Sequence, residues 1–257
     1  MEYKIVSEPE KPKTVTVITP TIASPKLIDA VQSVAAQTYE HVTHLIVLDG
    51  GRYRDKFYDI TIDNPLLFDN KLKVKISMTP ENTGADGFYG HRIYAGYPHL
   101  INSDYIFFLD EDNWYKPNHV ETLVEVLKDN EFAYSLREIY DENKEYICDD
   151  NCESLGKWPI WFTHDKTPQY LIDTSSFAFR TSFLIKTCQL WHSGWGGDRR
   201  YYNLIREQVK HDTNGQHTLC YRLDGNPNSV KPEFFEQGNE DNHKRYNGVF
   251  PWIKGKK

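Results

Sequence analysis

The chain of 257 residues has little cysteine, no excess of positive charge and no long apolar run. Its four cysteines include one close pair, Cys148 and Cys152, and no second pair is present to complete a tetrahedral zinc site. We therefore expect reduced, mostly structural thiols. A Cys148/Cys152 redox pair, or a zinc site that recruits a histidine, is the alternative.

The shortage of positive charge limits the partners. The formal net charge is -7 at pH 7, and this argues against binding to a phosphate backbone, which needs a basic face. No stretch approaches the roughly 20 apolar residues of a membrane helix. Residues Met1 to Lys13 alternate charge and proline without an apolar core, so no signal peptide is expected. These features predict a soluble, cytoplasmic protein that does not bind nucleic acid.

The sequence does contain enough apolar residues for a core, with 39% hydrophobic and 14% aromatic residues. Short apolar runs that indicate buried strands alternate with helical spacing of apolar residues. The predicted strands cover residues 14–19, ending at Pro20, then 42–48, 72–77 and 105–109, and the predicted helices cover 25–36, 91–100 and 117–128. Apolar strands separated by helices are typical of parallel βαβ units. We therefore expect an α/β fold with a mostly parallel, Rossmann-like central sheet flanked by helices.

Two segments do not show this repeat. Residues 52–70 form a polar and aromatic excursion, and residues 141–169 hold acidic, Cys, Trp and Pro residues with little periodicity. A strand over 170–180 and a helix over 198–210 follow, and residues 254–257 are expected to fray. Because no flexible linker is visible, residues 1–257 are expected to form a single domain.

The most informative motif follows the apolar run Tyr105 to Leu109, where Asp110, Glu111 and Asp112 stand in a row. They are expected at a strand tip, where the chain returns to solvent. Close carboxylates repel each other unless a cation or a proton lies between them, and a divalent metal is the simplest occupant. The alternative is a solvated acidic turn in which Asp112 or Asn113 caps the next helix.

Taken in order, the motifs resemble the family 2 glycosyltransferases of the GT-A fold over about residues 13–210. No single motif is decisive, and the ordered set carries the resemblance. The set consists of VTVITPT (15–21), HLIVLDG (44–50), ENTGADGFYGHR (81–92), IFFLDED (106–112), DTSSFAFRTSFL (173–184) and GWGGD (194–198). The last motif also resembles the WGGE/D motif of metal-dependent galactosyltransferases. The resemblance implies a nucleotide-sugar-binding half over 13–115 and an acceptor-binding half over 116–257.

The resemblance assigns roles to the acidic motif. Asp110 contacts the ribose, Asp112 binds the metal with Asp110 beside it, and Glu111 supports them from the side. Negative charge builds on the leaving diphosphate, and a cation offsets it. Carboxylate and phosphate oxygens are hard ligands, so Mn²⁺ or Mg²⁺ is expected rather than zinc.

Other residues are assigned to the nucleotide in the same way. Asp49 ends the second strand, where open α/β sheets bind ligands. The resemblance makes it the group that reads the nucleobase. The alternative is a role in an Asp-Gly turn. The backbone of Thr19, Pro20 and Thr21 forms a wall of that pocket. Arg92 resembles a basic residue that helps to hold the nucleotide, and His91 is an equally placed rival.

Asp198 is the candidate general base for the acceptor hydroxyl. It follows two glycines that let an acceptor approach, and it opens a predicted helix whose dipole favours the ionised carboxylate. A plain helix cap is the alternative. Tryptophans that can stack on a sugar ring or pack in the core are Trp158, Trp191 and Trp195, and histidines that can add a metal ligand are His192, His211, His217 and His243.

The chain departs from the family pattern at three positions, where Gly50, Asn113 and Gly197 replace residues that are often acidic. No QxxRW-type motif of processive synthases is present, so a single-addition enzyme fits better than a polymerase. The resemblance implies inverting, metal-dependent transfer of a sugar from a nucleotide-diphosphate donor to an acceptor hydroxyl in glycan biosynthesis. A sugar nucleotidyltransferase and an inactive carbohydrate-binding module on the same fold are the alternatives, although the former needs a glycine-rich loop after the first strand.

Overall fold

The computed structural model describes residues 11–62, 64, 73–160, 168–225 and 230–254. The first half of the chain alternates strands and helices, as predicted. Its elements are β1 (Val15–Thr21), α1 (Leu27–Ala35), β2 (Val42–Leu48), the 3-10 turn η1 (Gly51–Tyr53), α2 (Arg54–Thr61), β3 (Lys73–Met78), η3 (Ala85–Gly87), α3 (His91–Gly96), η4 (Tyr97–Leu100) and β4 (Tyr105–Phe108).

Two predictions for this half need correction. Strand β1 does not end at Pro20 but continues to Thr21. Pro20 is tolerated because at this height β1 pairs only with β2, while its pairing with β4 stops at Ile18. The excursion over 52–70 contains α2, which buries Phe57 and Thr61. Residues 63 and 65–70 of this excursion lie outside the described residues, and so does Leu72 of the predicted third strand.

The second half contains more regular structure than the sequence indicated. Its elements are β5 (Trp114–Tyr115), α4 (His119–Leu127), β6 (Phe132–Tyr140), β7 (Tyr146–Asp149), η5 (Thr174–Ser176), β8 (Phe177–Arg180), α5 (Thr181–Thr187), η6 (Cys188–Trp191), α6 (Gly197–Ile205), β9 (His211–Arg222) and α7 (Pro232–Arg245). The strand predicted over 170–180 is confined to β8, because Asp173 caps the turn η5 by accepting a hydrogen bond from the Ser175 N–H. The helix predicted over 198–210 ends at Ile205.

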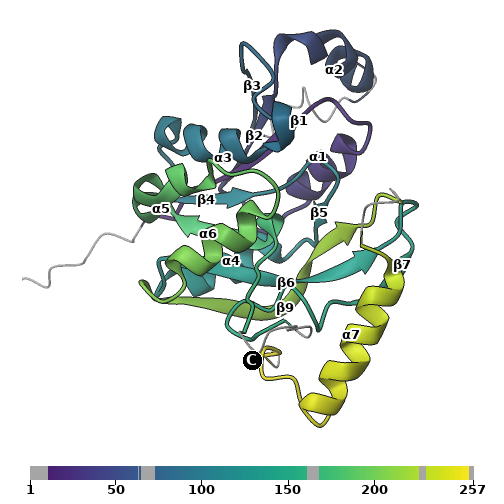
Figure 1. The fold of residues 1–257 in the computed structure, drawn as a ribbon. Helices are drawn as coiled ribbons and strands as arrows, with labels where there is room; N and C mark the ends of the chain where they lie inside the picture. Colours follow the sequence, from purple (N-terminus) through teal and green to yellow (C-terminus); the bar gives the residue numbers. More distant parts are fainter. Residues whose placement is uncertain (1–10, 63, 65–72, 161–167, 226–229, 255–257) are drawn as a thin grey trace, which may run out of the picture.

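The strands form one mixed sheet in the order β3-β2-β1-β4-β8-β6-β9-β5, with β7 paired to β6 (Figure 1). The pairs β2/β3, β1/β2, β1/β4 and β6/β9 are parallel, whereas β8 runs antiparallel to β4 and β6. More residues are paired in parallel than in antiparallel register, so the mostly parallel α/β fold is confirmed.

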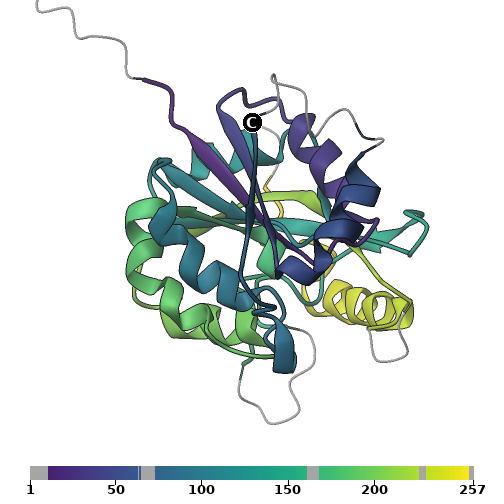
Figure 2. The ribbon, with the colours of Figure 1, turned by 90° about the horizontal axis from the view of Figure 1, so that it is seen from above.

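Helices cover both faces of the sheet because side chains alternate along each strand. On one face, Ile106 and Phe108 of β4 pack with residues of α3, α5 and α6. On the other face, Tyr105 and Phe107 pack with residues of α1 and α4. Figure 2 shows these two helical layers on either side of the sheet, while α7 lies apart from them beside β7.

The parallel register brings the functional segments together. Because β1, β2 and β4 run in the same direction, the residues that follow them lie at one edge of the sheet. Thr21, Asp49 and Asp110 come directly at or after these strand ends. In the described part of the chain, no helix is long and apolar enough to cross a membrane.

Candidate functional site

A cavity of about 600 Å³ lies at this carboxyl edge. Most of the site residues predicted from the sequence line it, namely Pro20, Thr21, Asp49, Asp110, Glu111, Asp112 and Asp198. Thr19 and Arg92 are not among its lining residues. The fold therefore joins the acidic motif after β4 to Asp198, 86 positions further along the chain, in one cavity.

Asp110 is held firmly at the floor of the cavity. Its carboxylate accepts hydrogen bonds from the Tyr94 hydroxyl at 2.9 Å and from the Ser175 hydroxyl at 3.1 Å. Burial, together with the charges of Asp112 and Asp173, raises the pKa of Asp110 to about 8. A carboxyl group with this pKa binds either a proton or a cation near neutral pH.

Asp112 and Glu111 differ in how they are held. Glu111 turns back toward the start of α1, where it accepts hydrogen bonds from the Thr21 hydroxyl and from the Ser24 N–H at 2.9 Å. Asp112 accepts no hydrogen bond from another described side chain, and burial with the Glu111 charge raises its pKa to about 6. Asp112 is therefore the carboxylate of the motif that stays available to a ligand.

Neither Asp112 nor Asn113 caps the next helix. The Asn113 side chain donates to the Ser175 hydroxyl at 3.1 Å and accepts from the Arg222 N–H at 3.0 Å. A carboxylate at position 113 could not donate to the Ser175 hydroxyl, whose own proton goes to Asp110, and it would be buried, because Asn113 is only 2% exposed. The amide at this position thus joins the acidic motif to η5 and β9.

The Asp49 side chain organises the loop that follows β3. One carboxylate oxygen accepts from the Thr83 N–H and the Thr83 hydroxyl, each at 2.7 Å, and the other accepts from the Gly84 N–H at 2.8 Å. Gly50, which replaces a frequent acidic residue, has φ +113° and would place a Cβ 2.9 Å from the Asn82 nitrogen. Both residues therefore shape the loop over 79–84, a role that the sequence did not indicate.

Thr19 and Arg92 support the cavity from outside. The buried Thr19 hydroxyl bonds to His44 Nε2 at 2.9 Å. The Arg92 guanidinium lies 3.5 Å from the centre of the Phe88 ring and donates to the Thr83 carbonyl at 3.1 Å. His91, the rival of Arg92, does line the cavity, and its Nδ1 lies 2.7 Å from the Ser193 carbonyl oxygen.

Asp198 lies in the first turn of α6, as expected, but it is not the cap, because Gly196 occupies that position with φ 73°. Its carboxylate accepts from the Arg199 N–H at 2.7 Å. Burial and the nearby Asp173 charge raise the pKa of Asp198 to about 7. Gly197 was expected to leave room for an acceptor. In the structure it faces His91 instead, because a Cβ at this position would come within 2.7 Å of the His91 ring. Gly197 allows close packing of α6 on His91.

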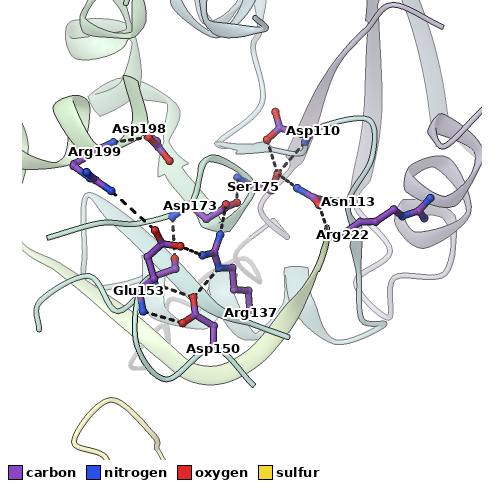
Figure 3. A network of polar contacts seen from close by, with 11 residues as sticks. Asp110, Asn113, Arg137, Asp150, Glu153, Asp173, Ser175, Asp198, Arg199 and Arg222 are labelled. Atoms are coloured by element: carbon purple, nitrogen blue, oxygen red, sulfur yellow. Dashed lines mark hydrogen bonds and ion pairs between the residues drawn. The ribbon is translucent and has the colours of Figure 1, made fainter. Parts of the chain in front are cut away.

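Sequence reasoning missed a cluster of charged residues between Asp110 and Asp198 (Figure 3). The Arg137 guanidinium forms ion pairs with Asp150, Glu153 and Asp173. Arg137, Glu153 and Asp173 line the cavity. The available signal was Asp173 inside the motif DTSSF, because nothing in the sequence of β6 connects Arg137 with its distant partners.

The aromatic and histidine candidates have different environments. Trp191 is fully buried in the core, whereas Trp195 is 84% exposed at the rim of the cavity. Trp158 packs against Trp252. The four histidines proposed as extra ligands do not line the cavity. The four cysteines are free thiols, with Cys148 half-buried and the others buried.

The carboxylates of Asp110 and Asp112, which line the cavity, are ligands that suit a hard divalent cation. Burial and nearby carboxylates raise the pKa values of Asp110 and Asp112, and a cation at this position would offset the negative charge of the buried carboxylates. Within the described residues, no group of three or more His, Cys, Asp or Glu side chains is arranged to hold a metal. Mg²⁺ and Mn²⁺ are commonly bound through one or two carboxylates plus substrate phosphates, and Asp110 and Asp112 offer such carboxylates.

The fold and the site define a class of protein, the transferases of the GT-A type, in which acidic residues at the carboxyl edge of an α/β sheet face a nucleotide-sugar site. Residues 16–186 match the model of the Glycosyl transferase family 2. The chain therefore belongs to this family.

Comparison with solved structures supports the fold. S. aureus TarS 1-349 in complex with UDP matches with a TM-score of 0.55 and 14% identity, over 82% of this chain and 60% of that one. The complex of the same protein with UDP-GlcNAc matches with a TM-score of 0.53 and 14% identity, over 87% and 64%. This chain thus spans less than two thirds of those structures. No curated protein matches the sequence.

Proposed function

We propose that the chain is a metal-dependent, inverting glycosyltransferase in which Asp198 is the general base. The observation that carries this proposal is the shared cavity, which holds Asp198 opposite the acidic motif of Asp110 and Asp112. An acceptor and a donor diphosphate can therefore meet in one place.

The chemistry of Asp198 supports the role of base. In the proposed reaction, Asp198 takes the proton of an acceptor hydroxyl, and the hydroxyl oxygen forms a bond to the anomeric carbon. The bond from that carbon to the diphosphate oxygen breaks, and its electron pair leaves with the nucleoside diphosphate. A pKa of about 7 suits this step, because a general base works best when its pKa lies near the working pH. A single displacement inverts the anomeric configuration.

The donor side is assigned to the opposite wall. Asp112 and Asp110 are proposed to hold Mn²⁺ or Mg²⁺, with Asp110 also contacting the ribose. A bound cation supplies positive charge against the charge that develops on the diphosphate. Pro20, Thr21 and the loop held by Asp49 are proposed to enclose the nucleobase, with Thr19 and Arg92 behind them and Glu111 supporting the motif.

We further propose a uridine nucleotide as the donor. The support is the likeness in fold to TarS, which was solved with UDP and with UDP-GlcNAc. The proposal also keeps residues 13–115 as the donor-binding half and 116–257 as the acceptor-binding half of one domain.

The test is release of nucleoside diphosphate from a panel of nucleotide sugars, measured with and without Mn²⁺. We expect slow hydrolysis of one or more UDP-sugars that depends on the cation, and its loss in Asp112→Asn. Release that persists undiminished in Asp112→Asn would remove this residue from the metal site. Absence of release from every donor, combined with binding of a free sugar, would favour the carbohydrate-binding module.

A further inference from the structure

The Arg137 side chain is only 3% exposed and forms three ion pairs at once. Its Nε lies 2.7 Å from Asp150, its Nη1 lies 2.7 Å from Asp173, and its Nη2 contacts Glu153. A guanidinium group is planar and donates hydrogen bonds to several carboxylates in fixed directions, whereas an ammonium group has no such fixed geometry. Arg137 thus fixes the relative positions of three acidic side chains, two of which, Asp150 and Glu153, come from the loop after β7, while Asp173 comes from the segment before η5.

One arm of this network leads to the donor side of the cavity. The second oxygen of Asp173 accepts from the Ser175 N–H at 2.9 Å. The Ser175 hydroxyl in turn donates to the Asp110 carboxylate at 3.1 Å and accepts from the Asp110 N–H at 3.0 Å. The position of Asp110 therefore depends on Asp173, and through it on Arg137.

The other arm leads to the acceptor side. Glu153 uses one oxygen for Arg137, and its other oxygen lies 4.0 Å from Arg199 Nη2. The Arg199 N–H donates to the Asp198 carboxylate. Figure 3 shows both arms diverging from Arg137, one toward Asp110 and one toward Asp198.

We propose that Arg137 is a positioning residue that sets Asp110 and Asp198 relative to each other through these two arms. The proposal rests on the function proposed above, because it assumes that Asp110 serves the donor and Asp198 the acceptor. In this role Arg137 acts through other residues and not on a reactant. Its effect on transfer arises because a small displacement of a reacting group lowers the rate strongly.

The two arms predict different kinetic effects. Asp173→Asn breaks the arm toward Asp110, so donor affinity should fall about tenfold. Because the Asp173 charge also raises the pKa of Asp198, turnover is compared well above pH 7, where Asp198 is ionised in both proteins and turnover at saturating donor should change less. Glu153→Gln breaks the arm toward Asp198, so turnover should fall about tenfold while donor affinity is kept. A merely structural ion-pair cluster would lower stability in both variants without this division, and equal effects on both quantities would overturn the proposal.

A double-mutant cycle tests whether Arg137 acts through Asp198. Arg137→Lys alone should lower transfer at saturating substrates by about tenfold or more. In the Asp198→Asn background the same substitution should lower it by no more than about twofold, because the group it positions has already lost its function. A full, additive effect in that background would contradict the proposal.

Arg222→Lys is the matched control. Arg222 is also buried and paired with a carboxylate, Asp29, but it is not among the residues that line the cavity. The Arg222→Lys variant should lose thermal stability while its donor affinity and its turnover stay unchanged. If Arg137→Lys does not fold, the two single-arm variants still decide the question. Wild-type transfer in Asp198→Asn alone would instead refute the proposed base, which is a separate failure.

Discussion

At the residue scale, the same type of side chain acquires different properties from its surroundings. Burial acts on both Asp150 and Asp198. Asp150 is compensated by Arg137 and by the N–H groups of Cys152 and Ser154, which hold its pKa below the usual value. Asp198 receives fewer such contacts and stands near Asp173, so its pKa rises to about 7. A buried carboxyl group that is incompletely compensated is a frequent mark of a functional site.

The raised pKa of Asp198 predicts how activity depends on pH. A general base must be ionised, so turnover should fall as pH decreases through about 7 and level off above it. Asp198→Asn should lower transfer by roughly 100-fold or more and abolish this acidic limb, while donor affinity is kept. The measurement is the pH profile of turnover for both proteins. An acidic limb near 7 that survives in Asp198→Asn would assign it to another group.

The Asp49 side chain gives a second prediction at this scale. Asp49→Ala removes the acceptor for the Thr83 and Gly84 N–H groups. We expect the free energy of unfolding to fall by about 1–3 kcal/mol and donor affinity to fall with it, whereas turnover at saturating donor is kept. Calorimetry and donor titration measure the two effects. Reduced turnover with unchanged donor affinity would contradict a role on the nucleotide side.

At the scale of elements, close contacts between helices and loops position the reacting groups. Helix α6 packs so closely on His91 that only glycine fits at position 197. Helix α3, which begins at His91, thereby sets where α6 begins and where Asp198 lies. The contact connects the donor and acceptor sides of the cavity.

Gly197→Ala tests this contact. Its Cβ would overlap the His91 ring, so α6 should shift at its first turn and carry Asp198 with it. We expect turnover to fall while donor affinity is retained. Gly96→Ala, at the end of α3, is the control, because a Cβ there meets nothing within 4 Å. Crystal structures and kinetics of both variants decide whether the loss follows the displacement of Asp198, and an unshifted, fully active Gly197→Ala protein would refute the argument.

At the scale of the whole molecule, the cavity exists only when the sheet is assembled. Its walls come from the ends of β1, β2 and β4, from the loop over 79–90 and from α6. A ligand of this cavity therefore binds the native state and not the unfolded chain, so it raises the thermal stability.

Thermal unfolding with UDP and Mn²⁺ tests this expectation. At a ligand concentration of 100 times Kd, the stabilisation is about 2.7 kcal/mol. UDP and Mn²⁺ together should raise the melting temperature more than either alone, because in the proposed site Asp110 and Asp112 would hold the cation and its charge would favour binding of the diphosphate. Asp112→Asn should remove the contribution of the metal. A larger shift with another nucleoside diphosphate would refute the uridine donor.

The parallel half of the fold and the acidic residues of the cavity that lie at the strand ends could be predicted from the sequence. The apolar run over 105–109 is continuous because β4 is buried on both faces, and such a run is visible without any tertiary information. The acidic motif, Asp49 and Asp198 follow strand ends or open a helix, so their places could be predicted from local patterns.

The place of β9 in the sheet and the partners of Arg137 depend on contacts between segments that are far apart in the sequence. Strand β9 carries polar residues such as Asp212, Asn214 and Gln216, so it lacks the apolar pattern of a strand and owes its place to pairing with β6. Arg137 has an acidic neighbour in the sequence, Glu138, but its three partners in the structure lie 13, 16 and 36 residues away. Pairing between distant segments leaves no local pattern, because the energy that favours it arises only when the whole sheet has formed.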